Sequence, residues 1–268
     1  MAILKVPNDN TILILPAVSS ANVPQLAIDL IIHSLQVPFY SLFEHNGYLY
    51  PFAGPRETFS SSQIDQSRNS QGVSSSLEIY HSSQITCLVQ RAPTLPNSKN
   101  LFINKVLLPF IYENSFSRIL FLSSSDASRL QDPTSSRVRL VHLPSSSISS
   151  DGSATHEEVN LLVQQIDFLS VAGSSIVTSL SVNDLPSRLP GSGITLPFLK
   201  VIATKTVSIM AIIFYVFDGD NTTDAQDMAR IALRALGIQQ PQAWVQPLSW
   251  DGIYGKSQQV GLELGMYG

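Results

Sequence analysis

The chain has 268 residues, of which 44% are hydrophobic and only 13% are charged, with a formal net charge of −4. Its 16 lysines and arginines form no dense cluster. This excludes nucleic acid as a main partner, because such binding draws most of its affinity from cations that neutralise phosphates.

The predicted elements alternate between strands and helices. Apolar runs bounded by turn residues predict strands at residues 11–17, 39–43, 77–80, 85–90, 118–123 and 207–217. Periodic apolar positions predict helices at 22–35, 98–114, 157–168, 194–204 and 222–236, and Ser-rich loops separate them at 56–76 and 144–154. This alternation predicts an α/β fold with a mainly parallel sheet covered by helices on both faces. We expect one domain over residues 1–250 and a C-terminal tether over 251–268.

The predicted helix at 22–35 is apolar around most of its circumference. Asn22 is suited to cap it, and Pro24 is tolerated in its first turn. A helix of this kind is buried on most sides, either inside the domain or beneath another subunit. The charged fraction is about half of the ~25% found in an ordinary soluble domain, which favours a partner that covers part of the surface.

The single cysteine, Cys87, lies in an apolar run and is expected to be a buried core residue. One cysteine allows no intrachain disulfide, which fits a reducing compartment. Residues 1–10 lack the pattern of a signal peptide. The longest apolar run, residues 210–217, is far shorter than the roughly 20 residues that span a bilayer. We therefore expect no membrane partner and a cytoplasmic protein, with the nucleus as a second location.

An acidic turn follows the strongest predicted strand. Asp218, Asp220 and Asp224 could hold Mg²⁺, as acidic clusters at strand ends do in phosphoryl-transfer enzymes. A magnesium-dependent phosphohydrolase is therefore the alternative function. The structural interpretation is that Asp220 or Asn221 caps the next helix and that Asp224 sits in its first turn, where the helix dipole favours negative charge. We favour the structural interpretation, because the companion lysine and threonine motifs of that chemistry are missing.

Three further patterns form no catalytic set. The Gly191-Ser192-Gly193 segment lacks the other residues of a nucleotide-binding loop and is interpreted as a tight turn into a helix. The serines at 123–125 are not part of a Gly-x-Ser-x-Gly nucleophile turn. Five scattered histidines show no metal-ligand spacing: His33, His45, His81, His142 and His156. We expect His33 to be a packed or rim residue, and we predict no catalytic residue, metal or cofactor.

The C-terminal end of the sequence reads Met266-Tyr267-Gly268, an apolar residue, a tyrosine and a final carboxylate. Glycines and polar residues precede it. This pattern favours a flexible tether with an amphipathic tip, although composition alone would produce it in roughly 1% of chains.

Four blocks of the sequence resemble the proteasome assembly chaperone 2 family. The most specific is residues 15–32, LPAVSSANVPQLAIDLII, which is similar to the family's N-terminal signature. The others are residues 191–195, residues 217–221 with Asp224 and Ala225, and a late segment with Pro247, Ser249 and Trp250. The resemblance spans most of the chain, but the loops at 56–76 and 144–154 match nothing in the family.

The resemblance implies a three-layer α/β/α domain similar to nucleoside phosphorylases, without their catalysis. It implies a heterodimer with proteasome assembly chaperone 1 that binds the α-subunit ring of the proteasome core particle and blocks premature capping. In the family, tails of the form hydrophobic-Tyr-any residue (HbYX) enter pockets between α subunits. Carried over here, Met266 would fill the apolar part of a pocket, the Tyr267 ring and hydroxyl would bind, and the Gly268 carboxylate would pair with a lysine.

Overall fold

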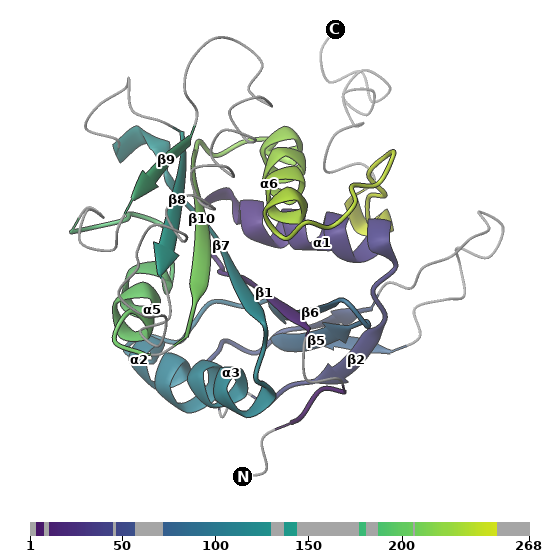
Figure 1. Cartoon of the computed structure of the whole chain (residues 1–268), viewed down its shortest axis with the longest axis horizontal. Helices are drawn as coiled ribbons and strands as arrows, with labels where there is room; N and C mark the ends of the chain where they lie inside the picture. Colours follow the sequence, from purple (N-terminus) through teal and green to yellow (C-terminus); the bar gives the residue numbers. More distant parts are fainter. Residues whose placement is uncertain are drawn as a thin grey trace, which may run out of the picture.

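A computed structural model describes residues 4–7, 11–44, 47–56, 72–129, 137–143, 177–180, 187–205 and 207–250 of the chain. They form a sheet with helices on both faces (Figure 1). Within these ranges, no helix has both the length and the apolar character needed to cross a bilayer.

The main sheet has eight strands in the order β2-β5-β6-β1-β7-β10-β8-β9. The strands are β1 (Ile12–Pro16), β2 (Phe39–Leu42), β5 (Leu77–His81), β6 (Ile85–Gln90), β7 (Arg118–Asp126), β8 (Val138–Leu143), β9 (Val177–Leu180) and β10 (Ile209–Val216). The four central strands, β6, β1, β7 and β10, run parallel. On one side β5 pairs antiparallel with β6, and on the other β8 pairs antiparallel with β10, while β9 runs parallel to β8. A separate two-stranded ribbon is formed by β3 (Ala53–Pro55) and β4 (Val73–Ser75).

Helices cover the two faces of the sheet separately (Figure 1). One face carries α1 (Val23–Leu35) and α6 (Thr222–Ala235); the other carries α2 (Lys99–Phe102), a π-helical turn (Ile103–Leu107), α3 (Leu108–Asn114) and α5 (Thr195–Ile202). Successive residues of a strand point to opposite faces. Ile14 of β1 therefore packs with the core beneath α1 and α6, whereas Leu13 and Leu15 pack on the other side. The predicted three-layer α/β/α fold is confirmed.

Helix α1 is buried along most of its length, because it packs against both the sheet and α6. This supports packing inside the domain as the reason for its apolar circumference. Pro24 lies in its first turn as predicted. Asn22 occupies the N-cap position, but its backbone is left-handed (φ 52°) and its side chain makes no capping hydrogen bond, so its predicted capping role is wrong.

Several elements differ from the sequence-based prediction. The strands β3, β8 and β9 were not predicted, and β4 falls inside the loop expected at 56–76. The helix expected at 98–114 is present, but a π-helical turn interrupts it just before Pro109, which has no backbone N–H for the i→i−4 hydrogen bond. The loop predicted at 144–154 and the helix predicted at 157–168 lie outside the described residues.

Strand β1 lies between β6 and β7 and occupies the switch point of the sheet. The chain leaves β1 through α1 on one face, whereas it passes from β6 to β7 through α3 on the opposite face. In doubly wound α/β folds, ligands bind in the crevice at the carboxyl ends of strands at such a switch point. The residues that follow β1 and end β7 therefore decide whether this crevice is open.

Candidate functional site

The serines at the carboxyl end of β7 are fully buried and make hydrogen bonds to neighbouring segments. Ser124 Oγ lies 2.8 Å from Ser19 Oγ and donates to the Ser20 carbonyl at 2.6 Å. The Ser124 backbone N–H donates to Ser19 Oγ at 3.0 Å. These contacts tie β7 to the segment that follows β1.

The two other serines of the run bind the first residue of α5 and the segment before that helix. Ser123 Oγ lies 2.6 Å from Thr195 Oγ1, and Ser125 Oγ donates to the Pro190 carbonyl at 2.8 Å. All three hydroxyls therefore have protein partners. The structure gives the serine run a packing role at the switch point, and none of the described residues that bind these hydroxyls is a general base.

The Gly191-Ser192-Gly193 segment is a tight turn, as predicted. Gly191 and Gly193 have φ angles of +72° and +62°, which side chains rarely adopt. A Cβ atom would lie 1.9 Å from Ser20 Oγ at Gly191 and 2.1 Å from the Val18 carbonyl oxygen at Gly193. The turn is thus packed directly onto the segment after β1, and it fills the crevice where doubly wound folds bind ligands.

The acidic turn before α6 is engaged in protein contacts. Asp220 accepts hydrogen bonds from the Thr222 N–H at 3.0 Å and the Thr222 hydroxyl at 2.6 Å. Asp224 pairs with Arg137 at 2.8 Å. Asp218, Asp220 and Asp224 do not converge, and no group of three His, Cys, Asp or Glu in the described ranges could hold a metal ion. The arrangement supports the structural interpretation over the magnesium site.

At the start of α6, the structure matches the first of the two predicted options, Asp220 or Asn221. Asn221 is the N-cap residue, but its side chain donates to the Gly219 carbonyl at 2.9 Å and makes no capping bond. The carboxylate that accepts from the first turn belongs to Asp220, one residue earlier. Asp224 lies in the first turn as expected.

The remaining candidates have packing roles or lie outside the described residues. Cys87 is fully buried, which confirms the prediction and raises the pKa of its thiol. His33 is half-buried and lines a pocket, which fits the expected packed position. The tail residues Met266, Tyr267 and Gly268 lie outside the part of the chain that the structure describes.

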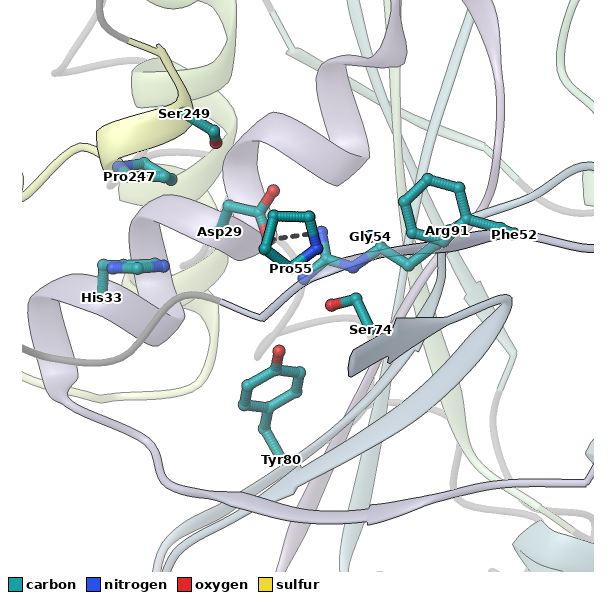
Figure 2. Close-up of a pocket in the computed structure, with 10 residues that line it drawn as sticks. All are labelled: Asp29, His33, Phe52, Gly54, Pro55, Ser74, Tyr80, Arg91, Pro247 and Ser249. Atoms are coloured by element: carbon teal, nitrogen blue, oxygen red, sulfur yellow. Dashed lines mark hydrogen bonds and ion pairs between the residues drawn. The ribbon is translucent and has the colours of Figure 1, made fainter. Parts of the chain in front are cut away.

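A pocket of about 260 Å³ opens beside α1, at the ribbon formed by β3 and β4 (Figure 2). Its lining comes from six separate parts of the chain: Asp29, His33, Phe52, Gly54, Pro55, Ser74, Tyr80, Arg91, Pro247 and Ser249. Phe52, Pro55 and Pro247 supply apolar walls, and the Ser74 and Tyr80 side chains point inward between them. Apolar walls with a few convergent polar groups are typical of binding sites.

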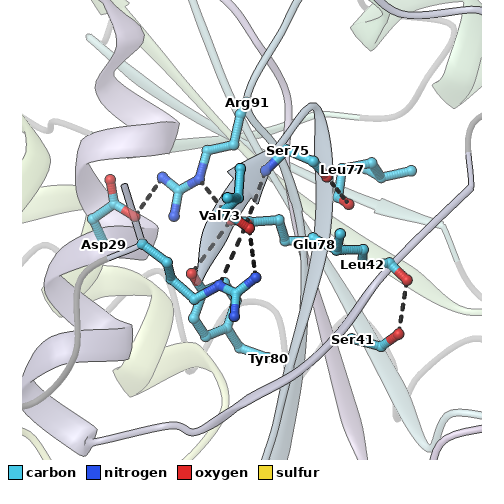
Figure 3. A network of polar contacts seen from close by, with 10 residues as sticks. Asp29, Ser41, Leu42, Val73, Ser75, Leu77, Glu78, Tyr80 and Arg91 are labelled. Atoms are coloured by element: carbon cyan, nitrogen blue, oxygen red, sulfur yellow. Dashed lines mark hydrogen bonds and ion pairs between the residues drawn. The ribbon is translucent and has the colours of Figure 1, made fainter. Parts of the chain in front are cut away.

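A network of ion pairs supports one side of the pocket (Figure 3). Arg91 Nη1 donates to Asp29 Oδ1 at 2.6 Å, and Arg91 Nε donates to Glu78 Oε2 at 3.2 Å. The Glu78 side chain has no exposed surface and also accepts from the Tyr80 hydroxyl at 3.3 Å. Arg56 Nε lies 3.9 Å from Glu78 Oε1. Two arginines thus balance two carboxylates, and the network has no net charge.

Two members of this network, Tyr80 and Arg91, have shifted pKa values. Burial raises the pKa of Tyr80 to about 12, so its hydroxyl is a neutral donor at physiological pH. Burial alone would lower the pKa of Arg91, but the Asp29 carboxylate, together with Tyr80 and Glu78, raises it. Arg91 is therefore a permanent cation that orients Asp29 and Glu78.

The same network fixes the ribbon that carries the pocket wall. Arg56 follows β3, and its Nη2 donates to the Val73 carbonyl of β4 at 2.6 Å. Its guanidinium lies over the Phe39 ring, 3.3 Å from the centroid. The Ser75 N–H donates to Glu78 Oε1 at 3.2 Å. A short ribbon is only marginally stable alone, so these contacts determine its position.

Exposed apolar side chains occur among the lining residues and at their neighbours in the chain or across the ribbon. Phe52 is 44% exposed, Val73 57% and Leu248 45%, and we call these three residues the pocket rim. Val73 pairs with Pro55 across the ribbon, and Leu248 stands between two lining residues in the short 3-10 helix Leu248–Trp250. Large exposed apolar side chains beside a pocket favour an interaction surface.

Sequence reasoning did not find this pocket. Asp29 and Arg91 are far apart in the chain, and no local motif links them. The detectable signals were weak: a charged residue on an otherwise apolar helix, and an arginine directly after the buried strand β6. Buried charges are normally paired, so a search for partners of Asp29 could have suggested the contact.

Comparison with known proteins shows the family of the chain. The sequence profile of the PAC2 family matches residues 13–236. The chain belongs to the PAC2 family. It is 27% identical over 250 residues to Proteasome assembly chaperone 2 of Danio rerio, with 91% of each chain covered. It is 25% identical over 256 residues to the Homo sapiens protein of that name, with the same coverage. The Saccharomyces cerevisiae protein is 25% identical over 265 residues, covering 91% of this chain and 94% of the yeast one.

Solved structures share the PAC2 fold seen here. PbaA of Pyrococcus furiosus, described as an archaeal homolog of proteasome-assembly chaperone, has a TM-score of 0.59 at 14% identity, covering 87% of this chain and 84% of its own. PbaB of the same organism, described as an archaeal proteasome activator, has a TM-score of 0.58 at 12% identity, covering 98% and 96%. At these identities the likeness concerns the fold. The family match confirms the resemblance that residues 15–32 indicated.

Proposed function

We propose that this chain is an assembly chaperone of the proteasome core particle. One observation carries the proposal: the chain is similar over about nine tenths of its length to proteins named Proteasome assembly chaperone 2 from vertebrates and from yeast. The match covers a similar share of each relative, so the likeness extends over the whole domain and is not confined to one motif.

In the proposed role, the chain forms a heterodimer with proteasome assembly chaperone 1. The pair binds the outer face of the α-subunit ring and blocks premature capping, in the cytoplasm and the nucleus. A protein that acts by occupying surfaces needs a large interface, commonly above about 1,200 Å². The low charged fraction and the apolar pocket rim support such coverage.

The C-terminal residues supply a second attachment in this proposal. Met266, Tyr267 and Gly268 would insert between neighbouring α subunits, and the preceding residues would act as the tether. Tethering raises the effective concentration of a weak binding element to roughly the mM range. The tail would thereby strengthen docking and exclude activators that carry similar ends.

In the proposed function, the protein is not an enzyme. The crevice at the switch point is filled by the serine run of β7 and the glycine turn before α5. The alternative is a phosphohydrolase that uses Asp218, Asp220 and Asp224. It has no support from the acidic turn, because these carboxylates do not converge there. Both observations support a role in binding.

Affinity purification with mass spectrometry tests the proposal. The tag is placed at the N-terminus so that the C-terminal carboxylate stays free, and the tag alone serves as the control. We expect α-type proteasome subunits and a second chaperone of similar size to dominate the eluate. Absence of both would overturn the proposal. Saturable Mg²⁺ binding in calorimetric titration, with phosphatase activity, would favour the alternative.

A further inference from the structure

The ribbon formed by β3 and β4 is loosely attached to the rest of the domain. None of its residues belongs to either hydrophobic core, and neither strand packs extensively against another described helix or strand. Among its residues only Ser74 is buried. A two-stranded ribbon is marginally stable by itself in water. Because few apolar contacts hold it, the ribbon is expected to move at a low cost in free energy.

One pair of charged side chains connects both strands of the ribbon to the sheet. We call Arg56, which follows β3, and Glu78 of β5 the clasp. The Ser75 N–H of β4 donates to Glu78 Oε1 at 3.2 Å. Arg56 Nη2 donates to the Val73 carbonyl of β4 at 2.6 Å and carries the guanidinium toward the same carboxylate. The position of the ribbon therefore depends on how Arg56 and Glu78 meet.

The clasp is not fully closed in this structure. Arg56 Nε lies 3.9 Å from Glu78 Oε1, beyond the roughly 2.7–3.2 Å of an N–H···O hydrogen bond. This Nε atom is buried and has no hydrogen-bond partner. The guanidinium rests on the Phe39 ring instead, 3.3 Å from its centroid. Buried polar groups are nearly always paired, so a short movement of the ribbon that formed the missing bond would be favourable.

Arg56 thus has two competing partners, the Phe39 ring and the Glu78 carboxylate. A cation over an aromatic ring and a hydrogen bond between charged groups stabilise by similar amounts, on the order of 1–3 kcal/mol. Two arrangements of comparable free energy are both populated. We infer that the ribbon is a strap that moves as a unit between these two positions on the sheet.

The strap changes the pocket beside α1. Gly54 and Pro55 of β3 and Ser74 of β4 line that pocket, so the ribbon forms one of its walls (Figure 2). The other walls belong to α1, the sheet and the segment near Trp250, which are anchored in the core. When the clasp closes, the ribbon wall moves relative to these fixed walls. The strap therefore sets the shape of the pocket.

Hydrogen–deuterium exchange of the purified full-length chain tests independent movement. The Arg56 N–H donates to the Gly72 carbonyl at 3.1 Å and the Ser75 N–H donates to Glu78, so both amides report on the ribbon. We expect the ribbon amides to exchange together and at least about 100-fold faster than those of β5 and β6. Exchange as slow as in β5 would overturn the inference, because the ribbon would then open only with the sheet.

The variant Arg56→Lys tests the clasp, since it keeps the charge but removes the Nε donor. It should accelerate exchange of the ribbon amides at least about tenfold, as expected for losing a hydrogen bond to a charged group. Arg230→Lys is the matched control, because Arg230 pairs with Asp227 on α6. It should change ribbon exchange less than about twofold. Equal exchange in Arg56→Lys and the wild-type chain would overturn the inference.

NMR relaxation dispersion distinguishes two positions from simple fraying, because it detects exchange on the μs–ms timescale. The Arg56 Nε signal and the ribbon amides should share one exchange rate, whereas the Arg230 Nε signal should show none. Phe39→Leu removes the competing ring and should raise the population of the closed position severalfold. Absence of exchange at Arg56 Nε, or a smaller closed population in Phe39→Leu, would overturn the inference.

Discussion

The Glu78 side chain is fully buried, and its carboxylate is surrounded by Arg91, Arg56 and the Tyr80 hydroxyl. Glu78→Ala would leave two arginines without their shared carboxylate, and breaking a buried pair in this way typically costs about 3–5 kcal/mol. We expect the variant to lower the free energy of unfolding, measured in urea, by at least about 3 kcal/mol.

The control for Glu78 is a carboxylate of the same charge at the surface. Asp227 pairs with Arg230 on α6, and its side chain is 46% exposed. Exposed pairs contribute about 0–1 kcal/mol, so Asp227→Ala should change stability by less than 1 kcal/mol. Equal losses in the two variants would contradict a special role for the buried network.

His81 gives the domain a predicted pH dependence. Burial lowers the pKa of His81, and its Nδ1 lies 2.9 Å from Thr86 Oγ1. The unfolded chain therefore binds more protons than the folded one as the pH falls below about 6.5, so stability should decrease between pH 7 and pH 5. His81→Gln should flatten this slope in thermal unfolding followed across that range. An unchanged slope would show that other groups produce the dependence.

At the level of elements, the buried segments could be predicted and the short polar ones could not. β1, β6, β10 and the helices α1 and α6 follow long apolar runs or clear helical spacing, which are strong signals. β3 is Ala-Gly-Pro and β4 is Val-Ser-Ser, residues that are mostly rare in strands. These strands form because Arg56 and Glu78 hold the ribbon, a tertiary cause without a local sequence pattern.

The turn before α5 can be tested as an element. Gly193→Ala would combine an unfavourable φ of +62° with a Cβ only 2.1 Å from the Val18 carbonyl oxygen. The strained φ alone typically costs about 1–3 kcal/mol, and the close contact adds to it, so we expect the free energy of unfolding to fall by more than the strain alone. Gly237→Ala is the control, because Gly237 has a similar φ of +69° with nothing within 4 Å. It should cost about 1 kcal/mol, and similar values for both would mean that the segment after β1 moves aside easily.

At the scale of the whole molecule, the candidate pocket depends on chain segments that meet only in the folded state. Its lining combines α1, the ribbon, β5 and the segment near Trp250. Secondary-structure patterns predict α1 and β5 but not the ribbon, and they do not predict which faces approach one another. The family resemblance, in contrast, could be recognised from residues 15–32, because that block is specific to a family and does not depend on tertiary contacts.

The C-terminal tail is tested in the complete complex. Trp250 is buried in the core, and residues 251–268 follow it. At 3.3–3.6 Å per residue, a chain of that length can extend at most about 60–65 Å, which allows its tip to reach a pocket between subunits from a docked domain. We expect deletion of Met266, Tyr267 and Gly268 to weaken binding to the core particle while partner pairing is unchanged.

Two matched changes distinguish insertion of the tail from a nonspecific contact. Tyr267→Ala should weaken binding about 30-fold or more, since a buried aromatic anchor contributes 2 kcal/mol or more at an interface. One residue added after Gly268 should be nearly as damaging, because it shifts the carboxylate and takes Tyr267 out of the penultimate position. The measurement uses purified core particle and a heterodimer whose partner lacks its own tail, so that one attachment remains. Equal affinity of intact and truncated chains would show that the tail does not dock.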